Sequence, residues 1–239
     1  RYDGYWGGKP ALESATFQII ADTSALAMAQ QTGESDVSLT IPATSLSLFK
    51  NDSQFVVDGA VGSRGQILYL NFKNEHLQDV NVRKAISMAI DKENYASVLN
   101  KGASASANGL FPDEVAFGGK DLNGASFDLE GAKKLLADAG YADADGDGIL
   151  EKDGKKLEFG LTTYSTKAEL PLYSEAMKSA FRDIGIDLTL DVGTYDTLVE
   201  KQKNGQFDLM LLSMTMSPTG DPQYFCDLSL KTGGSANYG

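Results

Sequence analysis

The chain has 239 residues, a formal net charge of −12 and a hydrophobic content of 42%. This length suits one large or two modest domains, and the hydrophobic content is ordinary for a globular protein. Nucleic acids and anionic membrane surfaces select lysine and arginine, so the negative charge argues against both as partners. A single cysteine, Cys226, excludes a disulfide bond within the chain.

Several catalytic classes are also disfavoured by the sequence. The only histidine is His76, so a metal site or catalytic dyad cannot draw on two histidines. Neither a Gly-x-Ser-x-Gly nucleophile motif nor a Walker-type phosphate loop occurs. No apolar run reaches the ~20 residues that a membrane-spanning helix needs. We therefore expect a soluble protein that is not an enzyme.

The first part of the chain alternates between strand and helix patterns. Strands are expected at residues 15–21, 34–39 and 54–57, and helices at 24–32 and 42–49. Small and flexible residues at 62–65 then mark the clearest domain boundary, which is either a hinge or an ordinary loop.

The central stretch predicts a strand at 66–72 followed by a helix with one apolar face. Val82, Ala85, Ile86, Ala89 and Ile90 recur at helical spacing on that face. Asp79 or Asn81 can cap the start of this helix, and Asp91 can cap a second one. Further helices are predicted at 127–141, 171–184 and 195–203, and strands at 156–164, 186–192 and 207–214. Alternating strands and helices favour an α/β fold.

An acidic turn is the first candidate site. Carboxylates at positions 1, 3 and 5 and glycine at position 6 match the opening of a calcium loop. Position 12, where a bidentate glutamate belongs, is Gly154. A structural calcium ion and a solvated acidic turn therefore both remain open. The candidate ligands are Asp143, Asp145, Asp147, the carbonyl group of Ile149, and Glu151.

The second candidate site lies where the strand at 207–214 ends. Ligands of α/β sheets gather at the carboxyl ends of strands. Tyr69 and Asn71 on the central strand are further candidates for ligand contact. The predicted ligand-binding residues are Tyr69, Asn71, Ser213, Met214, Thr215, Met216, Asp221 and Tyr224. For Met214 and Met216, a place in the core is the alternative.

Three segments of the central stretch, LNFKN, DVNVRKAISMAIDKENY and LNKG, resemble the signature of the bacterial extracellular solute-binding proteins of family 5. These are the peptide- and nickel-type receptors of ABC importers. The opening RYDGYWGGKPAL and the segment FDLEGAKKLLADAGY are similar to other parts of that family. Members are longer than this chain, which therefore resembles an internal piece of one.

The resemblance implies an α/β fold of the periplasmic-binding-protein type II. Residues 1–64 would form part of a first lobe, residues 65–232 a second ligand-binding lobe, and residues 233–239 the start of a return crossover. Residues 62–71 would be the hinge, because a strand at this place crosses between the lobes in the family.

The resemblance also implies a function. The protein would be the extracytoplasmic substrate-binding component of an ABC importer, in the periplasm or as a cell-surface lipoprotein. It would bind a peptide or a similar small solute as a monomer, work with membrane permease subunits, and use no cofactor apart from structural calcium. Alternatives are a receptor for nickel, a metal chelate or an oligosaccharide and, from other classes, a calcium-stabilised structural module or a hydrolase.

Two positions depart from the patterns of the family. Pro218 stands where dipeptide-binding relatives carry an acidic residue that pairs with the peptide amine, and Gln223 stands where nickel-binding relatives often carry histidine. Proline offers neither a charge nor an N–H group. We therefore expect dipeptides with a free amine, and bare nickel ions, to be poor ligands.

Overall fold

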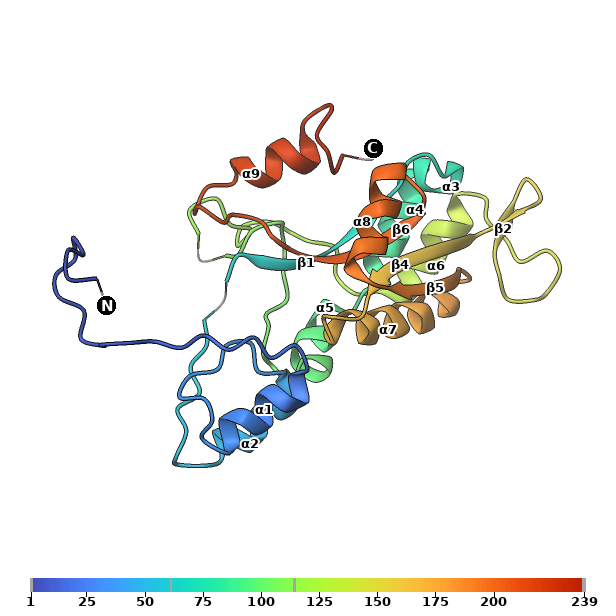
Figure 1. The fold of residues 1–239 in the computed structure, drawn as a ribbon. Helices are drawn as coiled ribbons and strands as arrows, with labels where there is room; N and C mark the ends of the chain where they lie inside the picture. Colours follow the sequence, from blue (N-terminus) through green and yellow to red (C-terminus); the bar gives the residue numbers. More distant parts are fainter. Residues whose placement is uncertain (1, 61, 114, 238–239) are drawn as a thin grey trace. The chain divides into compact units, whose positions relative to one another are not determined.

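The computed structural model describes residues 2–60, 62–113 and 115–237 (Figure 1). The chain divides into two units, Arg1–Val57 and Asp58–Gly239. The boundary expected between residues 64 and 65 lies slightly further along, where the first strand begins. Within the described part of the chain, no helix is both long and apolar enough to cross a membrane.

The described residues of the first unit form three short helical elements. They are α1 (Thr23–Gln31), the 3₁₀ helix η1 (Ala43–Ser45) and α2 (Leu46–Lys50), near the predicted positions. The Asp22 side chain caps α1 by accepting a hydrogen bond of 2.7 Å from the backbone N–H of Ala25. Gly33, with φ of 77°, follows the helix in the left-handed conformation that favours glycine.

The strands predicted at 15–21, 34–39 and 54–57 are wrong, because these segments form no ladder in the structure. Their apolar side chains are exposed instead: Phe17 is 92% exposed, Ile19 99% and Val37 79%. An alternating pattern becomes a strand only when a neighbouring strand satisfies its backbone groups, and the described residues of this unit supply none.

The second unit is built on a four-stranded sheet in the order β1-β6-β4-β5. The strands are β1 (Arg64–Leu70), β4 (Glu158–Tyr164), β5 (Asp187–Gly193) and β6 (Leu209–Thr215), so all four predicted strands are present. Strand β1 runs antiparallel to β6, and β4 is parallel to both β5 and β6. A small separate hairpin, β2 (Glu151–Lys152) with β3 (Lys155–Lys156), was not predicted.

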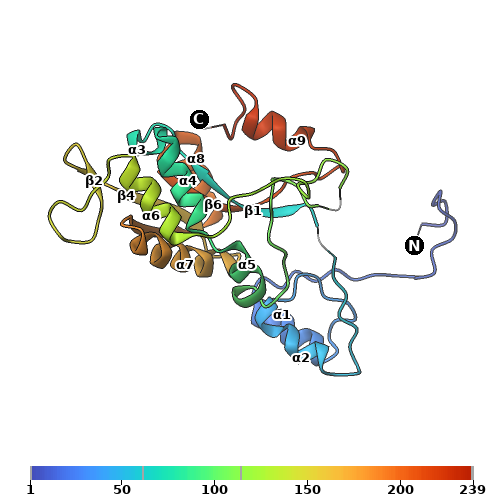
Figure 2. The ribbon, with the colours of Figure 1, turned by 180° about the vertical axis from the view of Figure 1, so that it is seen from behind.

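Two long helices make the crossovers between the parallel strands. Helix α7 (Glu169–Asp183) joins β4 to β5, and α8 (Tyr195–Asn204) joins β5 to β6. In the strand order, the connection from β4 leads outward to β5, whereas the connection from β5 leads back past β4 to β6. Because the two connections run in opposite directions, right-handed crossovers place their helices on opposite faces of the sheet. Figure 1 shows α7 below the sheet and α8 above it, and Figure 2 shows the same arrangement from behind.

Seven further helical elements are described in this unit, and those that begin after Asp79 and Asp91 have predicted caps. They are α3 (Glu75–Gln78), α4 (Val80–Met88), α5 (Lys92–Asn94), the π helix η2 (Tyr95–Leu99), α6 (Leu129–Asp138), α9 (Gln223–Phe225) and the π helix η3 (Cys226–Leu230). Asp79, Asp91 and Asp128 each accept a backbone N–H at the start of a helix. A short polar side chain at this position satisfies a donor that the helix itself cannot.

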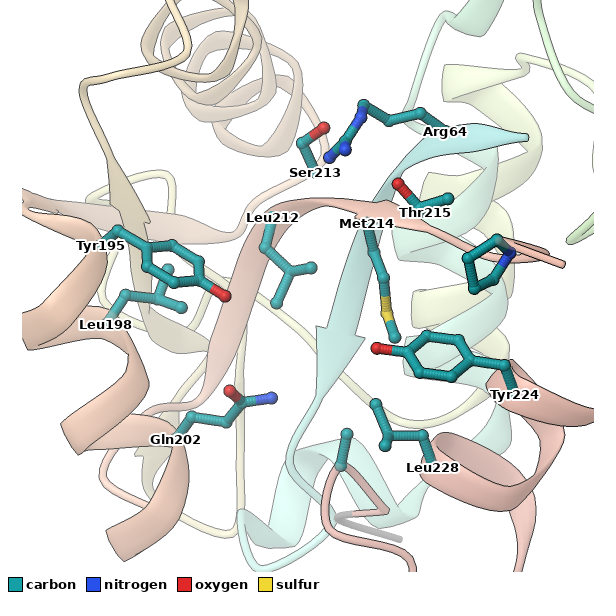
Figure 3. Close-up of a pocket in the computed structure, with 12 residues that line it drawn as sticks. Arg64, Tyr195, Leu198, Gln202, Leu212, Ser213, Met214, Thr215, Tyr224 and Leu228 are labelled. Atoms are coloured by element: carbon teal, nitrogen blue, oxygen red, sulfur yellow. The ribbon is translucent and has the colours of Figure 1, made fainter. Parts of the chain in front are cut away.

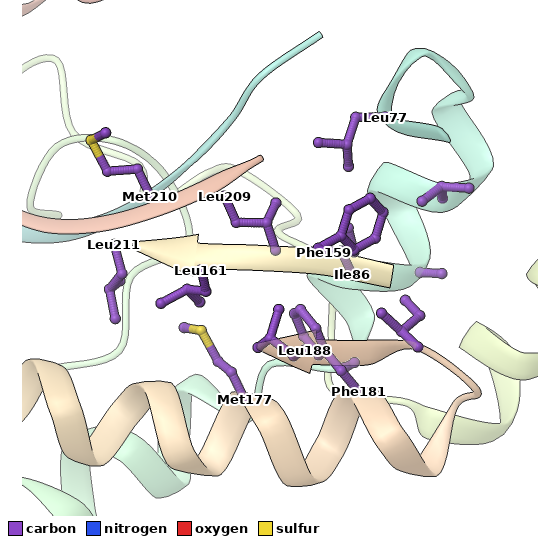
Figure 4. Close-up of a cluster of buried hydrophobic side chains, with 14 of the residues drawn as sticks. Leu77, Ile86, Phe159, Leu161, Met177, Phe181, Leu188, Leu209, Met210 and Leu211 are labelled. Atoms are coloured by element: carbon purple, nitrogen blue, oxygen red, sulfur yellow. The ribbon is translucent and has the colours of Figure 1, made fainter. Parts of the chain in front are cut away.

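The core of the second unit lies between the sheet and its helices (Figure 4). On α7 the buried residues are Leu170, Tyr173, Ser174, Met177 and Phe181, which follow the helical spacing of one face. The apolar spacing of residues 171–184 alone predicts Leu172 on the inward face of this helix, and that prediction is wrong, because the side chain is 47% exposed. The helix begins at Glu169, two residues before the predicted start, and its buried face includes Leu170 instead.

We predict that Leu170→Ala destabilises the protein far more than Leu172→Ala does. Leu170 is 0% exposed and Leu172 is 47% exposed on the same helix. Truncating a buried leucine costs about 2–5 kcal/mol, because transfer energy is lost and a cavity is left. Urea unfolding of both variants measures the difference, and equal losses of unfolding free energy would contradict the assigned helix face.

Candidate ligand-binding site

A pocket of about 280 Å³ lies at the carboxyl end of β6 (Figure 3). Its walls come from β6, from the start of β1, from α8 and from the segment containing α9 and η3. The lining residues that matter most are Arg64, Tyr195, Ser213, Met214, Thr215 and Tyr224. All of them belong to the second unit.

The strand that borders the pocket, β6, separates from β4 toward its carboxyl end. The two strands pair only at Leu161↔Leu209 and Thr162↔Met210, whereas β1 pairs with β6 over its whole length. Beyond these two pairs, side chains of β4 form hydrogen bonds with the backbone of β6. The Thr163 hydroxyl donates to the Leu211 carbonyl at 2.8 Å, and Tyr164 forms a hydrogen bond with the Ser213 backbone. The end of β6 is therefore free to border a cavity.

Alternation along β6 gives the pocket two kinds of wall. In Figure 3, Leu212 and Met214 point toward Tyr195 and Tyr224, while Ser213 lies on the other side of the strand. Successive side chains of a strand point to opposite faces, so Ser213 faces away from the apolar wall that Leu212 and Met214 form. The strand register places Thr215 opposite Arg64, on the same side of β6 as Ser213.

Four predicted ligand-binding residues line this pocket: Ser213, Met214, Thr215 and Tyr224. Tyr69 does not line the pocket but contacts Met214, which does. Its hydroxyl group is 2.9 Å from the Ser229 Oγ and donates to the Met214 sulfur at 3.5 Å, which ties η3 to the sheet. Burial raises the pKa of Tyr69, so its phenol stays protonated near neutral pH.

Asn71 is not in this pocket and holds the fold together. It is 4% exposed, and its Nδ2 donates to the carbonyls of Gly205 at 3.1 Å and Phe207 at 2.8 Å. Its backbone N–H donates to the Asp208 carbonyl at 2.9 Å. The side chain thus fastens the end of β1 to the loop that leads into β6.

Met216 and Asp221 also lie outside the lining. Met216 is 6% exposed, and its backbone N–H donates to the Ser63 carbonyl at 2.8 Å, which extends the pairing of β1 with β6. The Asp221 carboxylate accepts a hydrogen bond of 2.7 Å from the backbone N–H of Gln223 at the start of α9. Both residues shape the segment that follows β6.

Sequence reasoning missed Arg64 and the α8 residues Tyr195 and Gln202, which all line the pocket. The sequence contains no local signal for them. Arg64 reaches the site through the antiparallel register of β1 with β6, a pairing between residues far apart in the chain. The α8 residues reach it because the β5-to-β6 crossover folds over that face of the sheet.

A second, more open concavity of about 460 Å³ is lined by polar residues, including Thr162, Asp191 and Asp208. Its carboxylates already have partners. Asp208 accepts hydrogen bonds from the Gly160 backbone and from Asn74, each at 2.9 Å, and Asp191 pairs with Lys201. This concavity is therefore a weaker candidate for a solute.

The acidic turn brings three of its five predicted metal ligands together. Asp143, Asp145 and Asp147 have carboxylate oxygens within 4.8 Å of one another, and all three residues are exposed. Glu151 belongs to β2 and lies outside this group, and the Ile149 carbonyl stays a prediction, because the group comprises side-chain ligands alone. Backbone groups already use several oxygens. Asp143 accepts from the N–H groups of residues 146 and 148 at 2.8 and 3.0 Å.

The ammonium group of Lys156 already supplies a cation to this turn. Its Nζ lies 2.7 Å from an Asp145 oxygen and 2.5 Å from an Asp147 oxygen. The hydrogen bond from Lys156 holds the pKa of Asp147 below its usual value, and the two carboxylates raise the pKa of Lys156. A calcium ion here would have to displace the ammonium group.

We predict that Asn71→Ala lowers the free energy of unfolding by about 1–3 kcal/mol, because two buried carbonyl groups lose their donor. Asn123→Ala, at an exposed loop position, is the matched control and should leave stability within about 0.5 kcal/mol of the wild type. Chemical unfolding measures both. A neutral Asn71→Ala would show that the side chain is not a structural clamp.

We predict that Lys156→Met lowers the melting temperature at neutral pH and that the effect disappears in acid. The folded-state pKa of Asp147 is lowered, so its contribution is present above its unfolded pKa. That contribution is lost as the pH falls through the folded pKa.

Thermal unfolding of both proteins across the acid range measures this difference. Lys203→Met, which removes an exposed lysine of α8, is the control. A difference from the wild type that persisted below the folded pKa of Asp147 would contradict the ion-pair account.

Comparisons with known proteins agree with the α/β architecture. The Bacillus subtilis oligopeptide-binding protein AppA is 30% identical over 229 residues, which are 92% of this chain and 41% of that protein. The nickel-binding periplasmic protein of Escherichia coli is 27% identical over 94% of this chain and 44% of its own length. This chain therefore spans less than half the length of these relatives.

Solved structures show the same fold. NikA from Brucella suis in complex with Fe(III)-EDTA superposes with a TM-score of 0.77 at 28% identity, over 95% of this chain and 49% of that one. AppA in complex with a nonapeptide gives 0.75 at 26% identity, over 99% and 47%. The model of the bacterial extracellular solute-binding proteins, family 5 Middle, matches residues 1–237. The chain belongs to this family of solute-binding proteins.

Proposed function

We propose that the chain is part of the substrate-binding component of an ABC importer and that it binds a peptide or a similar small solute. The observation that carries this proposal is the pocket at the carboxyl end of β6, bordered by strand, helix and aromatic side chains. Family membership over residues 1–237 supports the same role. The relatives named above are binding proteins, which supports a function without catalysis.

The chemistry of the pocket favours a solute with both apolar and polar parts. Leu198, Leu212 and Leu228 offer apolar contact area, while Arg64, Gln202 and Ser213 offer hydrogen-bond donors. Such mixtures are typical of small-molecule sites, in which a few polar groups orient a mainly apolar contact. Pro218 lines the pocket where a carboxylate would be needed to bind a peptide amine.

A metal chelate is the second candidate, because nickel-binding proteins are among the relatives. The residues that line the pocket include no histidine and no cysteine, which are the side chains that suit a transition metal best. A metal would therefore be held through its chelator. This makes bare nickel the less favoured solute.

The wider setting of the protein is also proposed. The protein would work outside the cytoplasm, deliver its solute to membrane permease subunits and act as a monomer. Periplasmic binding proteins close by hinge motion around their ligands, and the start of β1 is the segment that we propose as such a hinge. A structural calcium ion at the acidic turn, if bound, would affect stability alone.

We predict that a short N-blocked peptide raises the melting temperature and that a free-amine dipeptide and nickel chloride do so much less. A ligand at about 100 times its dissociation constant stabilises the folded state by about 2.7 kcal/mol. Thermal-shift measurements with N-acetylated peptides, free dipeptides, a nickel–histidine chelate, sugars and nickel chloride test this.

Two aromatic variants show whether the response belongs to the pocket. Tyr224 lines it and is 46% exposed, and Phe127 lies before α6 and is 47% exposed. Tyr224→Ala should weaken binding, whereas Phe127→Ala should not. If no solute shifted the melting temperature, or if both variants behaved alike, the proposed function of this pocket would be wrong.

A further inference from the structure

The chain contains three asparagines that are followed directly by glycine: Asn108, Asn123 and Asn204. All three asparagines are exposed. Such a pair is chemically labile in water, because glycine lacks the Cβ atom that hinders the approach of its backbone nitrogen to the asparagine amide carbon. The dipeptide by itself therefore gives the three positions similar reactivity, and the structure of the backbone around each of them sets the difference.

Asn204 is held in place by the end of α8. The backbone N–H of Gly205 donates to the Gln202 carbonyl at 3.1 Å, and the Gly205 carbonyl accepts a hydrogen bond of 3.1 Å from the Asn71 side chain. Gly205 has the left-handed conformation, with φ of 63°, that commonly ends a helix. The nitrogen that would attack the Asn204 amide is thus already bonded, and the peptide on each side of it is fixed.

Asn123 lies in a stretch of backbone that the fold leaves free. Within the described part of the chain, no backbone group of residues 123–127 forms a hydrogen bond, whereas the N–H groups of Leu122 and Asp128, on either side, both do. The Gly124 nitrogen therefore has no hydrogen bond to break before it can approach the Asn123 side chain. Rotation of the backbone at this point is not opposed by a helix or a ladder.

Asn108 is an intermediate case, because packing restricts the glycine that follows it. Gly109 is half-buried, and the backbone of Gly119 lies so near that a Cβ atom on Gly119 would be 2.9 Å from the Gly109 nitrogen. A Cβ atom on Gly109 would itself be 2.7 Å from the Leu122 side chain. Gly109 consequently has less room than Gly124 to move toward the preceding amide.

We propose that Asn123 is a site of spontaneous deamidation in the folded protein, with water as the co-reactant. The Gly124 nitrogen forms a bond to the amide carbon of Asn123, the bond from that carbon to the amide nitrogen breaks, and ammonia leaves with the proton of the glycine N–H. Water then opens the succinimide ring at either of its carbonyl carbons. The product is aspartate or isoaspartate, and no atom changes its oxidation state.

The modification changes both charge and backbone at this loop. It adds a carboxylate to a chain whose formal net charge is already −12, and isoaspartate also lengthens the backbone by a methylene group. A cation is close by, since a Cβ atom on Gly124 would be 3.4 Å from the Lys92 Nζ. The modification does not depend on which solute the pocket binds, so it goes beyond the proposed function.

Incubation of the purified chain at mildly alkaline pH, followed by peptide mapping with digestion in acid, measures the conversion of each asparagine. Alkali favours the reaction because the glycine nitrogen must lose its proton. We expect conversion first at Asn123, then at Asn108, and at least about tenfold more slowly at Asn204, whose glycine must first lose its hydrogen bonds. In urea, where the chain is unfolded, the three asparagines should react at similar rates.

Two matched variants assign the acidic product that anion-exchange chromatography resolves. Asn123→Gln should remove the fast-forming acidic product, because glutamine would have to close a larger ring. Asn204→Gln, at an exposed position of α8, should leave that product unchanged. Native conversion at Asn204 or Asn108 as fast as at Asn123, an acidic product that persists in Asn123→Gln, or slow reaction of Asn204 even in urea would each overturn the proposal.

Discussion

The antiparallel ladder between β1 and β6 is the interaction on which the second unit depends. It joins residues near the start of the unit to residues near its end, from Arg64↔Thr215 to Leu70↔Leu209. Asn71 closes one end of this ladder with hydrogen bonds to two carbonyls, and the backbone of Met216 extends the other. Without this pairing, Arg64 would have no fixed position beside β6.

Strand β6, which borders the pocket, is paired unequally on its two sides. On one side β1 accompanies the strand over its whole length, and on the other β4 leaves it after two pairs. Backbone groups released in this way need new partners, and Tyr164 provides one for Ser213. Among the described residues, no group forms a hydrogen bond with the buried Ser213 hydroxyl. The carboxyl end of β6, where the pairing with β4 has ended, is the part of the strand that lines the pocket.

Family membership establishes that this chain belongs to a solute-binding protein, but it does not identify the solute. The relatives include a structure with a nonapeptide and one with Fe(III)-EDTA, on the same fold and at similar TM-scores. A shared fold therefore does not choose between a peptide and a chelate, because the choice depends on the side chains of the site. In this chain those side chains include Arg64, the tyrosines Tyr195 and Tyr224, and an apolar wall at Leu212 and Met214.

The sequence by itself determined the family, the helices with their aspartate caps and the four strands of the sheet, because periodicity and capping depend on neighbouring residues. Four of the eight residues predicted to bind the ligand line the pocket, and three of these four are consecutive residues of β6, Ser213, Met214 and Thr215. The sequence misjudged Leu172, whose helix begins earlier than predicted, and the strands of the first unit, which have no partner among the described residues. Only the tertiary structure decided that Arg64 meets Ser213, that Asn71 is a clamp and that Lys156 fills the acidic turn. The first two are contacts between segments distant in the chain, and strand register and packing fix them, which no local pattern encodes. Lys156 follows Asp147 by only nine residues and is brought back to it by the β2–β3 hairpin, which was not predicted.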